Sequence, residues 1–510
     1  MMRSFVTSLG SVVGLFILAL APAPHAAAQN ADPPVVGRAI VRVPDAPGGV
    51  HDIDAFIAEF AQGEGIVMTI GDSMLRPAET PPFYAYLLEY PARNQVEVQL
   101  ALDPENQPSS EYELSGAIVW GEALYAGEAS EGKSGSAWVA SLDPAHFTNQ
   151  YPIDLLGLDA AHDRSTGLGV VVAIIDSGID IAHPALAGRI APGGLNLIDG
   201  TPNVADVGDG VDTDGDLLVD EMVGHGTFVA GLVSLTAPDA KLLPVKVLNG
   251  DGTGDGWIVA KGMMYAIDRG VEVINLSLGS TYDSAAIEDA IDIAMQHGIV
   301  VVSAGGNQNE GEGDFEEFPA SKSDGMGVAA TDANDIKATF SNYNDKFSLS
   351  APGDSVPQAG DPDGWNPTKS IYSTLPGGGY GIWEGTSFST AFVSGAAALI
   401  RAQHPEWSAS LTTALNVQGY LEGTAVDIYP QNPQYADDES LGVGRLNAAA
   451  ATMISPPAPA LGDLNRDGSV NADDLAVMLA AWGLTHSSAD LDGDGIVGPA
   501  DLAILLAQWS

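Results

Sequence analysis

Four short apolar runs in the middle of this 510-residue chain restrict its fold more than any other feature. Each is apolar at nearly every position, as is typical of parallel strands that are buried on both faces. The runs lie at 170–175, 242–247, 271–276 and 299–302. Helix-like segments lie between them, at 228–235, 258–268 and 285–297. The alternation predicts an α/β domain with a mostly parallel sheet and helices on both faces.

Polar residues follow several of these runs at the point where each strand is expected to end. Asp176 follows the first run, Ser277 the third and Asn307 the fourth. His225 stands just before the helix-like segment at 228–235. Because ligands gather at the carboxyl ends of parallel strands, we expect these side chains to lie near one edge of the sheet.

Ser387 ends the turn Gly385-Thr386-Ser387, directly before an apolar segment that reaches position 400. Ser387 is therefore expected at a helix N-terminus. A hydroxyl at that place is an ordinary helix cap. The exposed amides and the helix dipole also favour negative charge there, which suits a nucleophile. On this stretch alone both interpretations are open.

Nine segments along the chain match one family in the same order. They are VVVAIIDSGIDIAHPAL, GHGTFVAGLVS, LLPVKVLNGDGTG, VEVINLSLGS, IVVVSAGGNQ, ATFSNY, LSAPG, STLPGGGYGIWEGTSFST and GVGRLNAAAA. They lie between positions 170 and 451, and over about residues 148 to 453 the chain resembles the subtilisin-like serine proteases. That family has its catalytic residues in the order Asp, His, Ser, which is the order of Asp176, His225 and Ser387 here.

The resemblance implies a role for each of these residues. Ser387 would be the nucleophile and His225 the general base that takes its proton and returns it to the leaving amine. Asp176 would orient the imidazole and stabilise its charged form. Asn307 falls where the family places the side-chain donor to the oxyanion.

The resemblance also implies where substrates bind. Ser277, Leu278 and Gly279 would form one wall of the primary specificity pocket and pair with extended substrate as an added strand. Glu317 aligns with the floor of that pocket, where an acid would favour Lys or Arg before the scissile bond. Its neighbourhood is acid-rich, so a solvated loop is the alternative.

The charge balance excludes some partners and favours others. The chain has 67 acidic and 19 basic residues, a net charge of −48, and no cysteine. Such a surplus argues against phosphate backbones, so nucleic acid is not expected as a partner. Without disulfides, loop stability in an exported protein has to come from packing or metals. Calcium is the natural cofactor, because carboxylates are its preferred ligands.

One candidate calcium loop lies in the segment between the Asp and His motifs. It places acids at relative positions 1, 3, 5 and 9, so that several oxygens face one side of a tight turn. These acids are Asp212, Asp214, Asp216 and Asp220. Leu217 stands where such loops normally have glycine, and a solvated acidic turn is the alternative.

The end of the chain is an internal repeat with an offset of 490 − 463 = 27 residues. Each copy supplies oxygens at positions 1, 3, 5 and 12 of a loop, with glycine at position 6. The expected ligands are Asp463, Asn465, Asp467 and Asp474 in the first copy and Asp490, Asp492, Asp494 and Asp501 in the second. An apolar helix is expected after each loop, at 475–482 and 502–509.

This duplicated loop and helix resembles the dockerins. The resemblance implies a small helical domain that binds calcium and attaches to a cohesin-type partner on a scaffold or surface protein. Met478 and Ala481 in one helix, with Ile504 and Gln508 in the other, are expected on the exposed faces. A self-contained, calcium-stabilised tail is the alternative.

Residues 1–28 have the pattern of a secretory signal peptide, with Arg3, an apolar run at 12–20 and a small-residue end. The apolar run is about half of the roughly 20 residues that span a membrane, so an anchor is the weaker alternative. No later stretch is long enough to span. The sequence therefore predicts export, to a secreted or cell-surface location.

Residues 33–147 are expected to form a separate α+β module. Its predicted strands are at 39–43, 66–70 and 96–100, and its predicted helix is at 53–60. An accessory domain and a prosegment that assists folding are both open, and a cut near 145–151 would release it. The peptidase domain would then cover 148–453, a Pro-rich linker 454–461 and the dockerin-like domain 462–510.

These observations together predict a secreted, calcium-stabilised serine endopeptidase that acts on protein or peptide substrates, expected to be a monomer. The competing function is a non-catalytic binding or scaffold protein that keeps the peptidase fold. The presence of Asp176, His225, Asn307 and Ser387 speaks against that alternative.

Overall fold

The computed structural model describes most of the chain from position 138 onward and parts of the segment before it. The described residues are 34–42, 53, 57, 68–76, 83–90, 120–129, 138–311, 316–322, 325–355, 366, 368–453, 462, 464, 470, 472–483, 489–492 and 496–509. Several predicted features lie outside them: the signal segment 1–28, the strand at 96–100, most of the helix at 53–60, the linker 454–461, and Asp463, Asn465, Asp467 and Asp494.

A seven-stranded sheet forms the centre of the body, by which we mean residues 138–453. Its strands follow the order β14-β13-β12-β10-β6-β8-β7, and every neighbouring pair is parallel. The bounds are β6 (Val171–Asp176), β7 (Leu195–Asn196), β8 (Lys241–Lys246), β10 (Val273–Leu276), β12 (Val300–Ala304), β13 (Met326–Thr331) and β14 (Phe347–Pro352). The four predicted strands are confirmed as β6, β8, β10 and β12.

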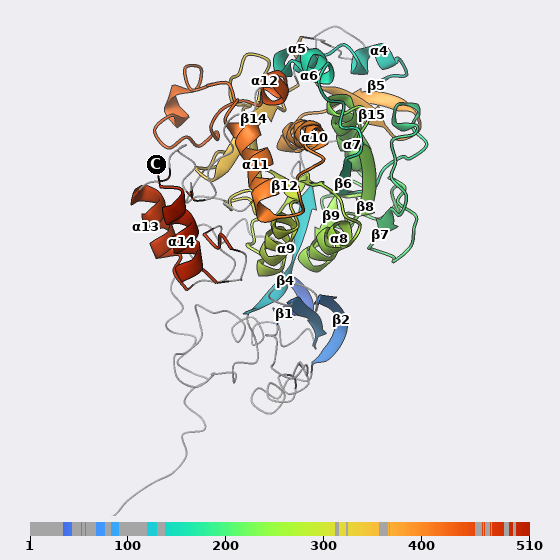
Figure 1. Ribbon diagram of the computed structural model, residues 1–510. Helices are drawn as coiled ribbons and strands as arrows, with labels where there is room; N and C mark the ends of the chain where they lie inside the picture. The colour runs from blue at the N-terminus through green and yellow to red at the C-terminus, as the bar shows by residue number, and fades with distance from the viewer. Residues whose placement is uncertain are drawn as a thin grey trace, which may run out of the picture.

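Two pairs of helices cover this sheet. Helix α7 (His225–Thr236) packs against α10 (Thr386–Gln403), and α8 (Gly256–Asp268) packs against α9 (Ala285–Gln296). Strands β12, β6 and β8 lie between the two pairs in Figure 1. The predicted helices are confirmed, and α7 begins three residues earlier than the apolar pattern suggested, at His225 itself. The body also contains α4 (Pro144–Phe147), α5 (Tyr151–Leu156), α6 (Leu158–His162), α11 (Leu411–Glu422) and α12 (Ala448–Met453).

An antiparallel sheet from the N-terminal part of the chain joins the body. Its strands are β1 (Pro34–Arg42), β2 (Thr69–Arg76), β3 (Phe83–Glu89) and β4 (Trp120–Ala129). They follow the order β11-β4-β1-β3-β2, so that β4 pairs with β11 (Leu278–Gly279) of the body. The predicted strand at 66–70 is displaced, since β2 begins at Thr69 and continues to Arg76. Strand β4 was not predicted.

The segment just before the expected peptidase domain is part of the body. Strand β5 (Trp138–Ser141) pairs with β16 (Gly379–Ile382), which in turn pairs with β15 (Tyr372–Leu375). Phe147 of α4 lies in a buried cluster with Tyr372, Tyr380 and Ile382. Residues 138–147 therefore pack against β15 and β16, and we count them with the body.

The C-terminal tail, residues 462–510, contains α13 (Ala472–Ala480) and α14 (Pro499–Ala507). Both helices begin three residues before the predicted positions, because the acid at loop position 12 lies inside the first helical turn. Met478 is buried in the small core of the tail, so its predicted exposure is wrong. Leu479, Trp482, Leu506 and Trp509 are exposed instead.

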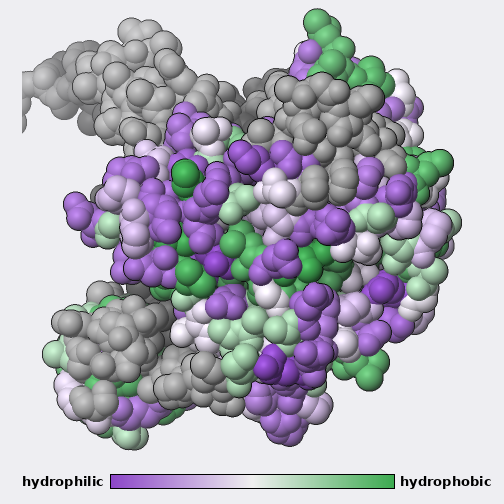
Figure 2. Space-filling model, turned by 90° about the horizontal axis from the view of Figure 1, so that it is seen from above, coloured by the Kyte–Doolittle hydropathy of each residue, from purple (hydrophilic) through white to green (hydrophobic). Residues whose placement is uncertain are grey.

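The face of the molecule seen in Figure 2 is mostly hydrophilic, with smaller hydrophobic patches, as the acidic composition leads one to expect. Within the described ranges, every helix is too short or too polar to cross a membrane.

Candidate active site

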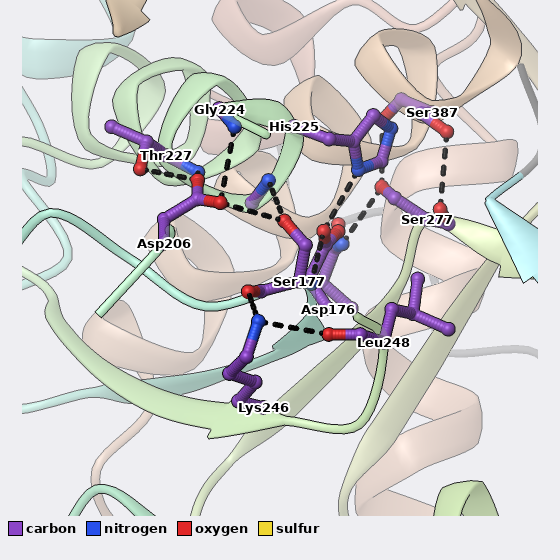
Figure 3. A network of polar contacts seen from close by, with 12 residues as sticks. Asp176, Ser177, Asp206, Gly224, His225, Thr227, Lys246, Leu248, Ser277 and Ser387 are labelled. Carbon is purple, nitrogen blue, oxygen red and sulfur yellow. Dashed lines mark hydrogen bonds and ion pairs between the residues drawn. The ribbon is translucent and has the colours of Figure 1, made fainter. Parts of the chain in front are cut away.

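Asp176 and His225 meet at the carboxyl edge of the central sheet. Asp176 is the last residue of β6, and His225 is the first residue of α7. The Nδ1 atom of His225 lies 2.8 Å from Oδ1 of Asp176, and both side chains are fully buried. Figure 3 shows the imidazole with Asp176 below it and Ser387 to its right. The structure thus brings together three residues that are far apart in the sequence.

Ser387 is the second residue of α10, at the helix N-terminus that the sequence predicted. Its Oγ donates to the carbonyl of Ser277 at 3.2 Å, and the Oγ of Ser277 donates to the carbonyl of Ser387 at 2.9 Å. Ser277 also accepts from Asn275, which accepts from Ser394 of α10. This buried chain of hydrogen bonds fixes the start of α10 against the end of β10.

Asn307 lies beside the same turn. Its Oδ1 accepts a hydrogen bond from the backbone amide of Thr386 at 2.9 Å. The hydroxyl of Thr386 accepts in turn from the amide of Gly306 at 3.0 Å. The acceptor end of the Asn307 side chain is therefore engaged one residue before Ser387, which leaves its Nδ2 as the donor end.

Aromatic side chains enclose the His225 ring. Trp383 contacts it edge to face, with ring centroids 5.6 Å apart, and Phe388 lies at 5.8 Å. Phe228, one turn along α7, packs on Phe388 at 4.5 Å. These rings keep the surroundings of the Asp176–His225 contact dry, where a charge-assisted hydrogen bond is stronger than in water.

The predicted wall of the specificity pocket is a short strand. Leu278 and Gly279 form β11, which pairs antiparallel with residues 129 and 128 of β4. On its other side β4 pairs with β9 (Thr253–Asp255) through residues 126–128. The end of β4 is thus inserted between two strands of the body, directly beside Ser277.

Glu317 is buried against that wall. Its side chain is 4% exposed, so the carboxylate is not part of a solvated loop. A Cβ atom added to Gly279 would lie 2.1 Å from Glu317 Oε1, so a side chain at this position would have to displace the Glu317 carboxylate. The structure therefore places a carboxylate next to the strand that was predicted to line the pocket.

The acidic loop between β7 and α7 brings three of its four predicted ligands together. Carboxylate oxygens of Asp212, Asp214 and Asp216 all lie within 4.8 Å of one another. Leu217 has φ +76°, the left-handed conformation that glycine usually supplies at this position.

Asp220 is engaged elsewhere in the same loop, because its two oxygens accept from the amides of residues 209 and 210. Glu221, which the sequence interpretation missed, is 7% exposed and has one buried oxygen without a hydrogen-bond partner. Burial raises the pKa of its carboxyl group, and nearby Asp216 acts in the same direction. A signal was present in the sequence, since Glu221 follows Asp220 directly.

The second tail loop is also assembled. Oxygens of Asp490, Asp492 and Asp501 lie within 4.8 Å of one another, and Asp490 and Asp501 are almost fully buried. Asp501 accepts from the amides of residues 491, 492 and 498. In the first copy Asp474 accepts from the amide of Leu464, the same contact 27 residues earlier (491 − 464 = 27).

Comparison with known proteins identifies both parts of the chain. The model of the subtilase family matches residues 167–447, more than half of the chain. The chain belongs to the subtilase family. A dockerin type I domain matches residues 461–508, so the tail is a dockerin domain.

Similar proteins are peptidases. An alkaline protease of Alkalihalobacillus alcalophilus is 35% identical over 303 residues, 58% of this chain and 67% of that protein. Subtilisin Savinase of Lederbergia lenta is 35% identical over 58% of this chain and 94% of its own. Thermitase of Thermoactinomyces vulgaris is 33% identical, over 61% and 98%. The family and these relatives identify the chain as a subtilisin-type serine endopeptidase.

Solved structures agree with this fold. A protease from Pseudoalteromonas arctica matches 62% of this chain and all of its own, with 27% identity and a TM-score of 0.50. Fervidolysin from Fervidobacterium pennivorans matches 84% of this chain and 62% of its own, with 22% identity and a TM-score of 0.56. The second likeness concerns the fold alone.

Proposed function

We propose that this subtilase hydrolyses peptide bonds with Ser387 as nucleophile, His225 as general base and acid, and Asp176 as the residue that holds His225. The observation that carries this assignment is the buried 2.8 Å contact between Asp176 and His225. Ser387 lies at the start of α10, where the amide dipoles suit a developing negative charge. One chain supplies every group, so a monomer suffices.

The steps follow from these positions. The Ser387 hydroxyl leaves the Ser277 carbonyl, attacks the substrate carbonyl carbon and passes its proton to His225 Nε2. Asp176 keeps the proton on Nδ1 and stabilises the imidazolium. His225 then protonates the leaving amine, and water hydrolyses the acyl-enzyme by the same route. The amide of Ser387 and Nδ2 of Asn307 would donate to the oxyanion; loss of such a donor in subtilisin lowers kcat about 100- to 1000-fold.

Labelling with a fluorophosphonate tests this assignment. The mature wild-type protein should be labelled and the Ser387→Ala variant should not, because the reagent reacts with an activated serine. Ser389→Ala is the matched control, since Ser389 lies on the same helix and its hydroxyl donates to the carbonyl of Ala351. An unlabelled wild type, or equal labelling of Ser387→Ala, contradicts the proposal.

Extended peptides are the proposed substrates. Residues 126–129 of β4 lie as a middle strand between β11 and β9. A substrate that took their place would gain backbone hydrogen bonds on both sides without regard to its sequence. Peptide chains that can be extended, such as unfolded or flexible segments, should therefore be the best substrates.

The N-terminal module is proposed to be a prosegment that occupies this cleft until it is cut. A cut after position 129 and before β5 would release it. The cut expected near 145–151 is disfavoured, because Gln150 is buried and exchanges hydrogen bonds with the backbone of Tyr372 at 2.7 and 2.8 Å. The proposed boundary therefore moves from 147 to the segment between 129 and 138.

Glu317 is proposed to select Lys or Arg before the scissile bond. A buried carboxylate beside the pocket wall is most stable with a cationic partner, and the close contact with Gly279 supports this position. Fluorogenic peptides that differ only at that residue should show higher kcat/KM for Arg than for Phe. Equal or greater turnover of Phe would contradict the proposal, and Glu317→Gln should remove the preference.

Calcium is proposed to bind the loop at 212–221. The donor set fits this ion, because Asp212, Asp214 and Asp216 offer clustered carboxylate oxygens and Glu221 has a buried oxygen without a partner. Glu221 replaces Asp220 as the fourth proposed carboxylate ligand. A bound ion there would neutralise acidic charge and stiffen the chain that leads into α7.

The dockerin domain is proposed to bind calcium in both loops and to attach the enzyme to a cohesin-type partner. The cluster of Asp490, Asp492 and Asp501 fits calcium. The exposed Leu479 and Trp482 recur 27 residues later as Leu506 and Trp509, so each copy offers an apolar contact. Together with the signal-like segment 1–28, the domain supports a secreted or surface-attached location.

A further inference from the structure

Beneath the proposed catalytic pair lies a buried carboxylate that none of the steps above uses. Asp206 belongs to the segment between β7 and α7 and is 2% exposed. Its oxygens accept from Ser177 Oγ at 3.2 Å, Gly224 N at 3.0 Å, Thr227 N at 3.0 Å and Thr227 Oγ1 at 2.6 Å. Figure 3 shows these contacts converging on the start of α7.

These contacts cap the helix that carries His225. The first amides of a helix have no partner within it, and the residue at the N-cap of α7 is a glycine, which has no side chain to serve them. Asp206 accepts from the amide of Thr227, and Ser177 Oγ accepts from the amide of Gly226 at 3.0 Å. The cap thus comes from two other segments of the chain.

Ser177 connects this cap with the other half of the catalytic pair. It follows Asp176 directly, and its amide donates to Asp176 Oδ1 at 2.7 Å. Its hydroxyl donates to Asp206, and its carbonyl accepts from Lys246 Nζ. Ser177 and Asp206 together therefore join the end of β6 to the start of α7, and so set the distance between Asp176 and His225.

The hydrogen bonds to Asp206 favour an ionised carboxylate, whereas its burial and the nearby charge of Asp176 raise its pKa. All four contacts come from donors, which favour the charged form. Lys246 is 7% exposed and is attracted by Asp206 and then by Asp176. Burial raises the pKa of Asp206 and lowers the pKa of Lys246, and the ammonium offsets one of the two negative charges. The charged groups near His225 at the ends of β6 and β8 and before α7 are Asp176, Lys246 and Asp206.

We propose that Asp206 is a positioning residue for peptide hydrolysis: it caps α7 and, through Ser177, holds His225 in register with Asp176. This inference rests on the catalytic roles proposed for Asp176 and His225. Asp206 itself would touch neither the substrate nor the reacting atoms.

The test is the Asp206→Asn variant, which keeps the size of the side chain but replaces one carboxylate oxygen with an NH₂ group, which cannot accept a hydrogen bond. Active sites are counted by end-point titration with a fluorophosphonate. We expect kcat per titrated site to fall about 10- to 100-fold, since small misplacements cost this much, and KM to change less than about twofold. The acid limb of the pH profile of kcat/KM reports the pKa of His225 in the free enzyme. It should move to lower pH, because a looser contact with Asp176 stabilises the imidazolium less.

Glu272→Gln is the matched control. Glu272 Oε2 accepts from the amide of Val171 at 2.7 Å, at the opposite end of β6 from Asp176. This variant should lose stability without a change in kcat per titrated site or in the acid limb. If Asp206 had only a structural role, Asp206→Asn would likewise lose stability without a change in kcat per titrated site or in the acid limb.

A second variant covers the case in which Asp206→Asn does not fold. Thr227→Val removes one hydroxyl donor to Asp206 and should shift kcat and the acid limb in the same direction, by about threefold in kcat for a contact worth about 0.7 kcal/mol. Unchanged kcat per titrated site and an unchanged acid limb would overturn the inference. An unlabelled wild type would instead overturn the proposed catalytic group.

Discussion

The N-terminal module and the dockerin tail flank the same body but are stabilised in different ways. The module contributes β4 to strand pairs with the body, and its Arg42 forms a 2.6 Å ion pair with Asp289 of α9 in which both side chains are buried. The tail has its own core around Met478 and Leu505 and its own acidic loops. The module is therefore built against the body, whereas the tail has its own core and, in its second loop, a carboxylate cluster.

Because of this difference, the largest effect is expected from a calcium chelator, which should destabilise the tail. Its core is small, and buried acids such as Asp501 would lose the proposed calcium ion to the chelator. We expect peptides from 472–483 and 496–509 to lose their protection from hydrogen exchange, on the order of 100-fold or more. Hydrogen exchange with mass spectrometry measures this.

Strands β6 and β12 of the body serve as the internal control in the same experiment. Their side chains belong to the large apolar core, so their protection should change little. Unchanged exchange in the tail after chelation, or equal losses in tail and body, would break the comparison.

The next effect concerns the module. Arg42→Ala removes the buried ion pair with Asp289, and breaking a charge pair of this kind costs about 2 kcal/mol or more. We therefore expect a separately added module with Arg42→Ala to inhibit the mature enzyme about 30-fold more weakly, measured as Ki with a peptide substrate. Chelator should not reproduce this loss.

Arg38→Ala is the matched control for that measurement. Arg38 lies 3.6 Å from Asp255 of the body, but its side chain is 38% exposed. Exposed pairs contribute about 1 kcal/mol or less, so Ki should change less than about fivefold. Equal effects of the two substitutions would show that the buried pair is not what holds the module.

The smallest effect is expected at the proposed calcium loop of the body, residues 212–221. Asp214→Asn weakens the proposed site, but the large apolar core remains. We expect the melting temperature of the body in calcium to fall by about 1–2 °C, because a loss of about 1 kcal/mol shifts a domain of about 150–250 residues by about 2–4 °C and the body is larger. A fall in the melting temperature several times larger than this would contradict the ranking.

Local patterns in the sequence predicted the body well. The apolar runs became β6, β8, β10 and β12, since strands buried on both faces leave a continuous apolar signal. Asp176 and His225 follow from motifs at the ends of such elements, and the structure places them in contact.

Contacts between distant segments were not predictable in the same way. Strand β4 pairs with β9 and β11, more than a hundred positions away, and its own sequence does not indicate these partners. Asp220 and Asp206 accept from different backbone amides, and Asp206 also accepts from two hydroxyl groups, which spacing alone does not reveal. Met478 lies in one core with Leu491, Val497 and Leu505 of the other copy of the repeat, a contact that the apolar pattern of its own helix does not reveal.

The mass of the matured protein tests the central claim most directly. If Ser387, His225 and Asp176 form a working peptidase and β4 lies in its cleft, the purified wild-type chain should cut itself between residues 129 and 138. The Ser387→Ala variant, produced and purified in the same way, should stay joined at that segment. The same cut in both proteins, or an intact wild-type chain, would contradict the account.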